Sequence, residues 1–244
     1  MIHSTQLIVL HTIKYTESSL LLYAYTHLFG RQTYLLRGVR RAKNHSAVAH
    51  FFPLNILEAE VYHKQGANMQ YIKEYRAVSA LQGIRTNLYK SVIALFLGEV
   101  LYKTIKEEEP NAMLFRFLVH AIEELDALSE GFVNFHLHFI THYCAHLGYA
   151  PTLNFHPEHT PIFDIPQGSF VPVGTASALA FSKEESILLH HFYTAPNASA
   201  AAAIPLHAAF RNRYIEAIIR HLSYHLNTSL ELTSPKVLRQ IFGA

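Results

Sequence analysis

The spacing of apolar residues changes near residue 80, and no other feature of the sequence constrains the fold as strongly. In residues 54–62, Leu57 and Val61 fall on one face of an extended strand while Glu58 falls on the other, which is the period of a half-buried strand. After residue 80, apolar residues recur every three or four positions, as in amphipathic helices. We therefore predict an α+β fold, with a strand-rich domain over residues 1–80 and a mainly α-helical domain over residues 81–244.

The strand-rich domain contains five short runs of β-branched and aromatic residues, separated by turn-forming segments. The turns include Phe29-Gly30-Arg31 and a hairpin-type connection over residues 64–68. Five strands in so short a length favour a small closed barrel, for which an OB-type β-barrel is the leading candidate. The strand pattern alone equally permits an SH3-like barrel. The five runs are residues 6–13, 20–26, 32–37, 54–62 and 69–75.

The helical domain is predicted to be interrupted once by an irregular insert. Residues 149–181 lose the helical period and are rich in proline, glycine and phenylalanine. Ser182 and Glu185 then form a capping-box pattern, which predicts the start of another helix. The remaining predicted helices cover residues 89–101, 114–125, 132–147 and 206–226, with a short one near residues 238–242.

Charge is unevenly distributed, although the formal net charge is only +2. Residues 1–80 carry nine Lys or Arg against four Asp or Glu, whereas residues 81–150 carry five against eight. The remainder carries six of each. A basic first third beside a mildly acidic middle predicts that only one module binds a polyanion.

The most informative segment is the run RQTYLLRGVRRAK, which contains five cations and no acidic residue. Phosphate is the natural partner of such a cluster. The nearby rings of Tyr23, Tyr25, Phe29 and Tyr34 could stack on bases, as small barrels do when they hold single strands. The alternative interpretation is a solvated basic loop beside ordinary core aromatics. The predicted DNA-binding cations are Arg31, Arg37, Arg40, Arg41 and Lys43.

Several of the 18 histidines have a spacing that can bind zinc. His138, His142 and His146 recur at four-residue intervals, as do His221 and His225. Because no third ligand and no H-E-x-x-H motif accompany them, we predict that the first group borders the core. A metallohydrolase that uses this stripe is the alternative, and it requires exposed histidines with bound metal.

No catalytic signature is recognised, whether a phosphate-binding glycine loop, a dinucleotide fingerprint or a nucleophile elbow. The sole cysteine, Cys144, lies on a predicted helix and is expected to be buried. A single cysteine permits no internal disulfide, which fits a reducing cytoplasm. We also recognise no signal peptide and no membrane-spanning segment. The expectation is a non-catalytic cytoplasmic protein without a cofactor or metal.

The order and spacing of several segments resemble the RecO family of recombination mediators. The opening IVLHTIKYTESSLLLYAYTHLFGRQTYLLRGVRRAK is similar to that family's first strands, with an hT.kY.E.S start, a T...GR turn and a KG.R basic stretch. The segment HLGYAPTL at residues 146–153 resembles the element that closes the third helix of the family. The segment LTSPKVLRQIF at residues 232–242 resembles its C-terminal element. The resemblance covers essentially the whole chain.

This resemblance implies an N-terminal OB barrel, a helical domain and a small zinc-finger-like insert. It further implies binding to single- and double-stranded DNA, annealing of complementary strands, and joint work with RecR and single-strand-binding protein to load RecA. Arg37, Arg40, Arg41 and Lys43 take the DNA-contacting role, and Arg31 is a weaker candidate. The alternative is a protein–protein adaptor of a repair complex without direct DNA contact.

The insert departs from the pattern of many family members, which carry two cysteine pairs. Here the first pair falls on His156 and His159, and the second falls on residues without ligand-type side chains. Two histidines alone do not close a tetrahedral zinc site. We expect the insert to keep its shape without metal, held by Phe155, Phe163 and Phe170.

The family's helical domain binds the acidic C-terminal tail of the single-strand-binding protein. Such a tail needs an apolar pocket with basic residues at its mouth. Arg211, Arg213 and Arg220 on the predicted long helix are the candidates, and the alternative is that they are ordinary surface arginines.

Overall fold

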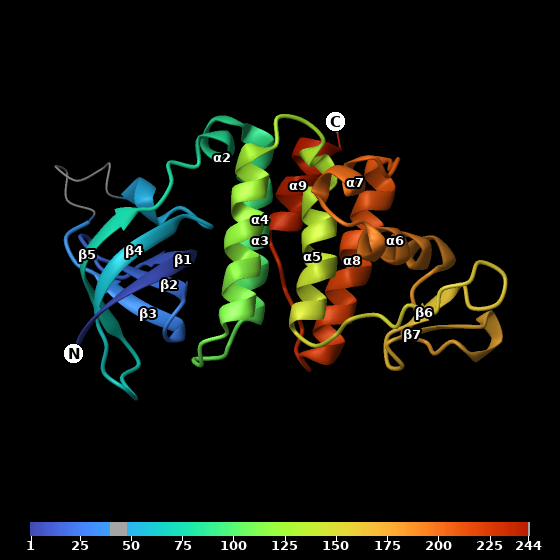
Figure 1. The fold of residues 1–244 in the computed structure, drawn as a ribbon, viewed down its shortest axis with the longest axis horizontal. Coiled ribbons are helices and arrows are strands. Elements are labelled where there is room, and N and C mark those ends of the chain that lie inside the picture. Colours follow the sequence, from blue (N-terminus) through green and yellow to red (C-terminus); the bar gives the residue numbers. More distant parts are fainter. Residues whose placement is uncertain (40–47, 244) are drawn as a thin grey trace. The chain divides into compact units, whose positions relative to one another are not determined.

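The computed structural model describes residues 1–39 and 48–243, and Figure 1 shows the course of the chain. The chain forms two compact units, Met1–Ala127 and Leu128–Ala244. The strands of the first unit end at Ala77, near the predicted boundary at residue 80, whereas the first compact unit continues through three helices.

Five strands of the first unit form a closed barrel in the order β1-β2-β3-β5-β4. All neighbours are antiparallel except β3 and β5, which pair in parallel at Tyr34–Gln70 and Leu35–Tyr71. The prediction of a five-stranded OB-like barrel is therefore confirmed. The elements are β1 (Ile2–Lys14), β2 (Leu20–Thr26), β3 (Gly30–Leu36), the 3-10 turn η2 (Ala49–Phe51), β4 (Ile56–Tyr62) and β5 (Gln70–Ala77).

The two-residue period of β4 shows why this segment folds into a barrel. Leu57 and Val61 are fully buried in the barrel core, and removing such side chains from water is the main driving force for closure. Glu58 and Glu60 point outward, where they pair with cations on β5. A register shift between Glu60 and Val61 marks a bulge in the β4–β5 ladder.

Three helices complete the first unit. The side chain of Asn87 accepts hydrogen bonds from two backbone N–H groups at the start of α3, which is a standard N-cap. Gly98 lets α3 approach the barrel, since a Cβ there would lie 2.7 Å from Cβ of Pro53. The helices are α2 (Gln82–Thr86), α3 (Leu88–Thr104) and α4 (Ala112–Ala127), and α4 buries the predicted apolar face of Leu114, Leu118, Ala121, Ile122 and Leu125.

The second unit contains the remaining helices and the insert. The predicted capping box is confirmed, because the Ser182 hydroxyl accepts from the N–H of Glu185 while the Glu185 carboxylate accepts from the N–H of Ser182. The long helix lies close to its predicted position. The elements are the 3-10 turn η3 (Phe132–Asn134), α5 (Phe135–His146), α6 (Lys183–Thr194), α7 (Ala198–Ala202), α8 (Ala208–His225) and α9 (Ser234–Phe242).

The insert between α5 and α6 is a short two-stranded sheet with an aromatic core. It contains β6 (Ile162–Asp164), β7 (Ser169–Val171) and the 3-10 turn η4 (Val173–Thr175). The Phe170 ring packs edge-on against Phe155 and Phe163 at centroid distances of 5.2 and 5.3 Å. That these rings hold the insert in shape without metal stays a prediction.

Candidate nucleic-acid interface

Arg37 is exposed at the end of β3, where the basic segment leaves the barrel wall. Its guanidinium lies over the ring of Tyr71, 5.0 Å from the centroid, and one of its N–H groups donates to the Tyr71 hydroxyl at 3.4 Å. This arrangement places an exposed cation beside an exposed aromatic ring.

Tyr71 belongs to a row of exposed apolar and aromatic side chains that crosses three strands. Tyr62 on β4 is the register partner of Tyr71 on β5 and of Ile2 on β1. Tyr71 is 39% exposed, Tyr62 46% and Ile2 49%, so the row faces solvent on the outside of the barrel. We call these three residues the aromatic row. Exposed planes next to a cation are the combination that stacks unpaired bases.

Arg40, Arg41 and Lys43 lie outside the described residues. The segment that contains them is flanked by Arg37 on one side and by Ala49 on the other. The guanidinium of Arg85, an exposed residue of α2, donates to the Ala49 carbonyl oxygen at 3.3 Å. Arg85, which is not among the predicted DNA-binding cations, therefore adds a cation at the second flank.

Arg31 has a structural role in the first unit, and its predicted DNA contact stays a prediction. Its guanidinium donates to the carbonyl oxygens of Tyr102, at 2.7 Å, and of Ile105, where α3 ends. It also lies over the Tyr102 ring, 4.9 Å from the centroid. Burial lowers the pKa of Arg31, although the neighbouring Tyr102, Tyr23 and Glu107 oppose the shift. A cation at a helix C-terminus satisfies free carbonyl groups and the helix dipole.

Tyr34 does not fit its predicted role as a base-stacking ring, because its side chain is fully buried in the barrel core. A ring without exposed surface cannot stack on a base. Burial also raises the pKa of its hydroxyl. Of the other rings considered in the sequence, Tyr25 is buried as well, and Tyr23 packs against Tyr102 at 4.9 Å. The exposed aromatic rings of this part of the barrel are instead those of Tyr62 and Tyr71 in the aromatic row.

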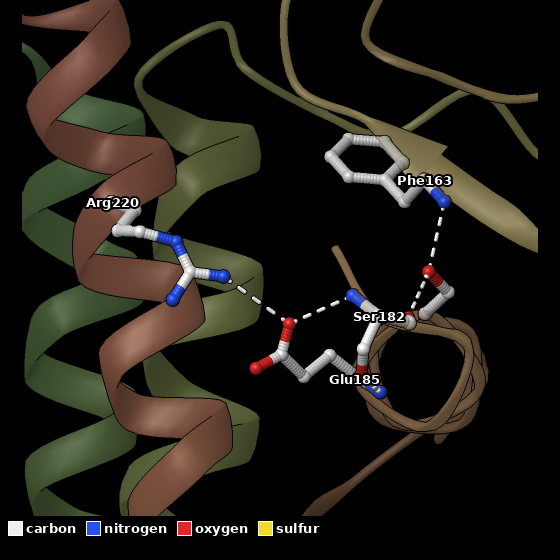
Figure 2. A network of polar contacts seen from close by, with 5 residues as sticks. Phe163, Ser182, Glu185 and Arg220 are labelled. Carbon is white, nitrogen blue, oxygen red and sulfur yellow. Dashed lines mark hydrogen bonds and ion pairs between the residues drawn. The ribbon is translucent and has the colours of Figure 1, made fainter. Parts of the chain in front are cut away.

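The three arginines predicted to bind an acidic tail all make contacts within the second unit. Arg211 donates to the Leu206 carbonyl oxygen at 2.7 Å, and burial lowers its pKa. Figure 2 shows Arg220 directed toward the Glu185 carboxylate, which it contacts at 3.2 Å while that carboxylate also caps α6. Arg213 is exposed, and its guanidinium lies 4.9 Å from the centroid of the Phe210 ring. Arg211 and Arg220 are thus engaged by groups of the chain itself, and binding of an acidic tail by the three stays a prediction.

Two of the three histidines of the α5 stripe, His138 and His142, are half-buried beside the core as predicted, whereas His146 is exposed. Nε2 of His138 lies 3.1 Å from the Ala195 carbonyl oxygen, and Nε2 of His142 lies 3.2 Å from that of Phe192. These contacts attach α5 to the C-terminal end of α6. Cys144 on the same helix is buried, which confirms the prediction made for it from the sequence. Burial raises the pKa of its thiol.

His156 and His159 are exposed in the insert, with their ring centroids 4.3 Å apart. Nδ1 of His156 accepts from the backbone N–H groups of Glu158 and His159 at 3.2 and 3.3 Å. Within residues 1–39 and 48–243, no three His, Cys, Asp or Glu side chains converge so as to hold a metal ion. Among the same residues, no helix is both long and apolar enough to cross a membrane.

The barrel with its exposed basic and aromatic edge, followed by a helical second unit, defines a class of two-part OB-barrel proteins. Residues 1–81 match the family described as "Recombination protein O N terminal", and residues 85–233 match "Recombination protein O C terminal". The chain therefore belongs to the RecO family of DNA repair proteins.

Curated relatives agree over the full length. A DNA repair protein RecO of Flavobacterium psychrophilum is 31% identical over 240 residues, which cover 98% of each chain. The DNA repair protein RecO of Phocaeicola vulgatus is 31% identical over 243 residues and that of Christiangramia forsetii 29% over 244, in both cases covering all of each chain. The resemblance found in the sequence is confirmed.

Proposed function

We propose that this chain is a non-catalytic recombination mediator that binds single- and double-stranded DNA through its barrel. It anneals complementary strands and, with RecR, helps load RecA onto DNA coated by single-strand-binding protein. The observation that carries the proposal is Arg37 lying on Tyr71 within the aromatic row, at the start of a segment that adds Arg40, Arg41 and Lys43.

The proposed mechanism needs no bond to be made or broken. The basic segment neutralises phosphates and so lowers the repulsion between two strands. The aromatic row holds bases of an unpaired strand by stacking, which leaves their pairing edges accessible. Both effects favour strand pairing, and neither requires a catalytic group.

Within the helical unit, Arg213 is the strongest candidate for the acidic tail of the single-strand-binding protein. Arg211 and Arg220 are occupied by the Leu206 carbonyl and the Glu185 carboxylate. Arg213 is exposed beside the Phe210 ring, and it therefore offers charge and apolar surface together.

Substituting Arg37, Arg40 and Arg41 together by Gln is expected to weaken binding to a labelled single-stranded oligonucleotide by about a hundredfold, because three phosphate contacts are lost.

Tyr71→Ala alone is expected to weaken binding of the same oligonucleotide about tenfold, because one stacking plane is removed. Fluorescence anisotropy at low salt measures both effects.

The matched controls are Arg239→Gln and Tyr224→Ala in the second unit. Arg239 is paired with Glu216, and Tyr224 is 45% exposed, close to the 39% of Tyr71. Both controls should bind DNA like the unsubstituted chain. If the triple Arg variant binds as tightly as these controls, the barrel does not hold DNA and the adaptor function is the better account.

A further inference from the structure

A hollow of about 610 Å³ lies at one end of the barrel, and the proposed DNA surface does not use it. It is bounded by the connection between β4 and β5 and by the connection between α3 and α4, which Figure 1 shows at the same end of the first unit. Tyr62 and His63 are consecutive, so their side chains point to opposite sides of the strand end. Tyr62 joins the aromatic row, and His63 lines the hollow.

One wall of the hollow is a flat aromatic surface. The rings of Phe29 and His63 stack in parallel, with centroids 3.9 Å apart and planes inclined by 8°. The His3 ring packs edge-on against Phe29 at 5.2 Å. All three rings keep partial exposure, so the stack offers a plane for a further flat group.

Two carboxylates, Glu108 and Glu109, line the hollow on the side of the α3–α4 connection. Both are exposed, and in the part of the chain that the structure describes neither has an ion-pair partner. The outward glutamates of β4 differ, because Glu58 pairs with Arg76 and Glu60 with Lys73. The negative charges of Glu108 and Glu109 are thus available to a cationic ligand.

The backbone on both sides of the hollow is fixed. The carbonyl oxygen of Glu107 accepts from the N–H of Arg31 at 2.9 Å, and the α3–α4 connection packs so closely on Gly30 that a Cβ there would lie 2.4 Å from the Glu109 carbonyl oxygen. On the opposite side, the buried Gln70 side chain accepts a hydrogen bond from the N–H of Lys64 and donates one to the carbonyl oxygen of Lys64. The ring pair and the backbone that carries the two glutamates are therefore held in place before any ligand arrives.

We propose that this hollow binds an arginine side chain presented by a protein partner. A guanidinium is planar and cationic, so it can stack on the Phe29–His63 pair while its N–H groups donate to Glu108 and Glu109. The Met1 ammonium, which donates to the His63 carbonyl oxygen at 3.3 Å, is a positive group in the same lining, but the two carboxylates outweigh it. The same carboxylates repel phosphate, which makes nucleic acid the poorer occupant.

The probe is N-acetyl-arginine amide, added to the full-length ¹⁵N-labelled chain while amide chemical shifts are followed. Saturable shifts are expected at Phe29, His63 and residues 64–70, with a dissociation constant in the millimolar range for one isolated side chain. The Glu108→Gln/Glu109→Gln double variant should bind the probe about fivefold more weakly. Because these two residues are exposed, the variant should keep the fold.

N-acetyl-citrulline amide, which has the same shape without the charge, should cause much smaller shifts. Equal shifts from both probes, or no localised shifts at tens of millimolar, would overturn the proposal. Localised shifts from deoxycytidine monophosphate but not from the arginine probe would also overturn it, in favour of a nucleotide site. The double variant should bind single-stranded DNA as the unsubstituted chain does, so failure here and failure of the proposed DNA interface are distinguishable.

Discussion

Lowering the pH from 6.5 to 4 is expected to destabilise the second unit by about 3 kcal/mol through His221 alone. Burial, reinforced by the neighbouring His225, lowers the pKa of His221 from 6.5 to about 4. The unfolded chain therefore takes up a proton below pH 6.5 while the folded chain does not. Stability from this group is complete above pH 6.5 and is lost as the pH falls toward 4.

The surroundings of His221 explain the direction of this shift. Its ring lies 5.6 Å from Phe163 and 6.4 Å from Phe181, and only 3% of the residue is exposed. Nε2 lies 3.3 Å from the Tyr149 carbonyl oxygen, which favours the protonated form but does not offset burial. His136 adds to the same acid sensitivity, since burial and then Arg211 lower its pKa to about 3.

Urea unfolding measured between pH 7 and pH 4 checks this prediction. His221→Phe, which fits the aromatic surroundings, should flatten the pH profile by about 3 kcal/mol. His207→Gln changes an exposed histidine of the same unit and should leave the profile unchanged in shape. If the free energy of unfolding depends on pH in the same way for the unsubstituted chain and for His221→Phe, then His221 does not remain uncharged in the folded protein.

Gly30→Ala is expected to destabilise the first unit by about 3 kcal/mol or more. Gly30 has a φ of +59°, and an added Cβ would lie 2.4 Å from the Glu109 carbonyl oxygen and 2.8 Å from that of Glu107. Both obstacles are backbone atoms that cannot rotate away. The substitution must therefore displace the α3–α4 connection from the β2–β3 turn.

The matched control for this prediction is Gly66→Ala in the β4–β5 connection. Gly66 has a φ of +74° but no atom within 4 Å of an added Cβ, so only the backbone penalty of about 1 kcal/mol applies. Thermal unfolding of the two variants separates the loss of stability caused by the clash with the α3–α4 connection from the loss caused by the positive φ alone. Equal losses of stability would mean that the α3–α4 connection does not pack on Gly30.

The fold was predictable from the sequence because its main elements have a regular period. The alternation in β4 and the 3.6-residue period of α4 are visible as soon as apolar residues are marked. Closure of the barrel by a parallel β3–β5 pair depends on residues 36 positions apart, so the local pattern could not distinguish an OB-like from an SH3-like barrel.

The candidate site was predicted less well because side-chain direction depends on register. Tyr34 shares the inward face of β3 with Gln32 and Leu36, so the alternation of this strand already argued against an exposed ring. The sequence could not distinguish the structural role of Arg31 from the exposed position of Arg37, because the partners of Arg31 at the end of α3 lie more than 70 positions away. Tyr71 could be recognised as a candidate site residue only from the structure, through its register with Tyr62 and its contact with Arg37.

The central claim, that the barrel binds single-stranded DNA through phosphate contacts, is tested most directly by anisotropy of a labelled single strand across a salt series. If Arg37, Arg40, Arg41 and Lys43 each neutralise one phosphate, the slope of log affinity against log salt should be roughly −3. A steep slope near that value is the predicted result. A flat response, or no binding at low salt, would contradict the account.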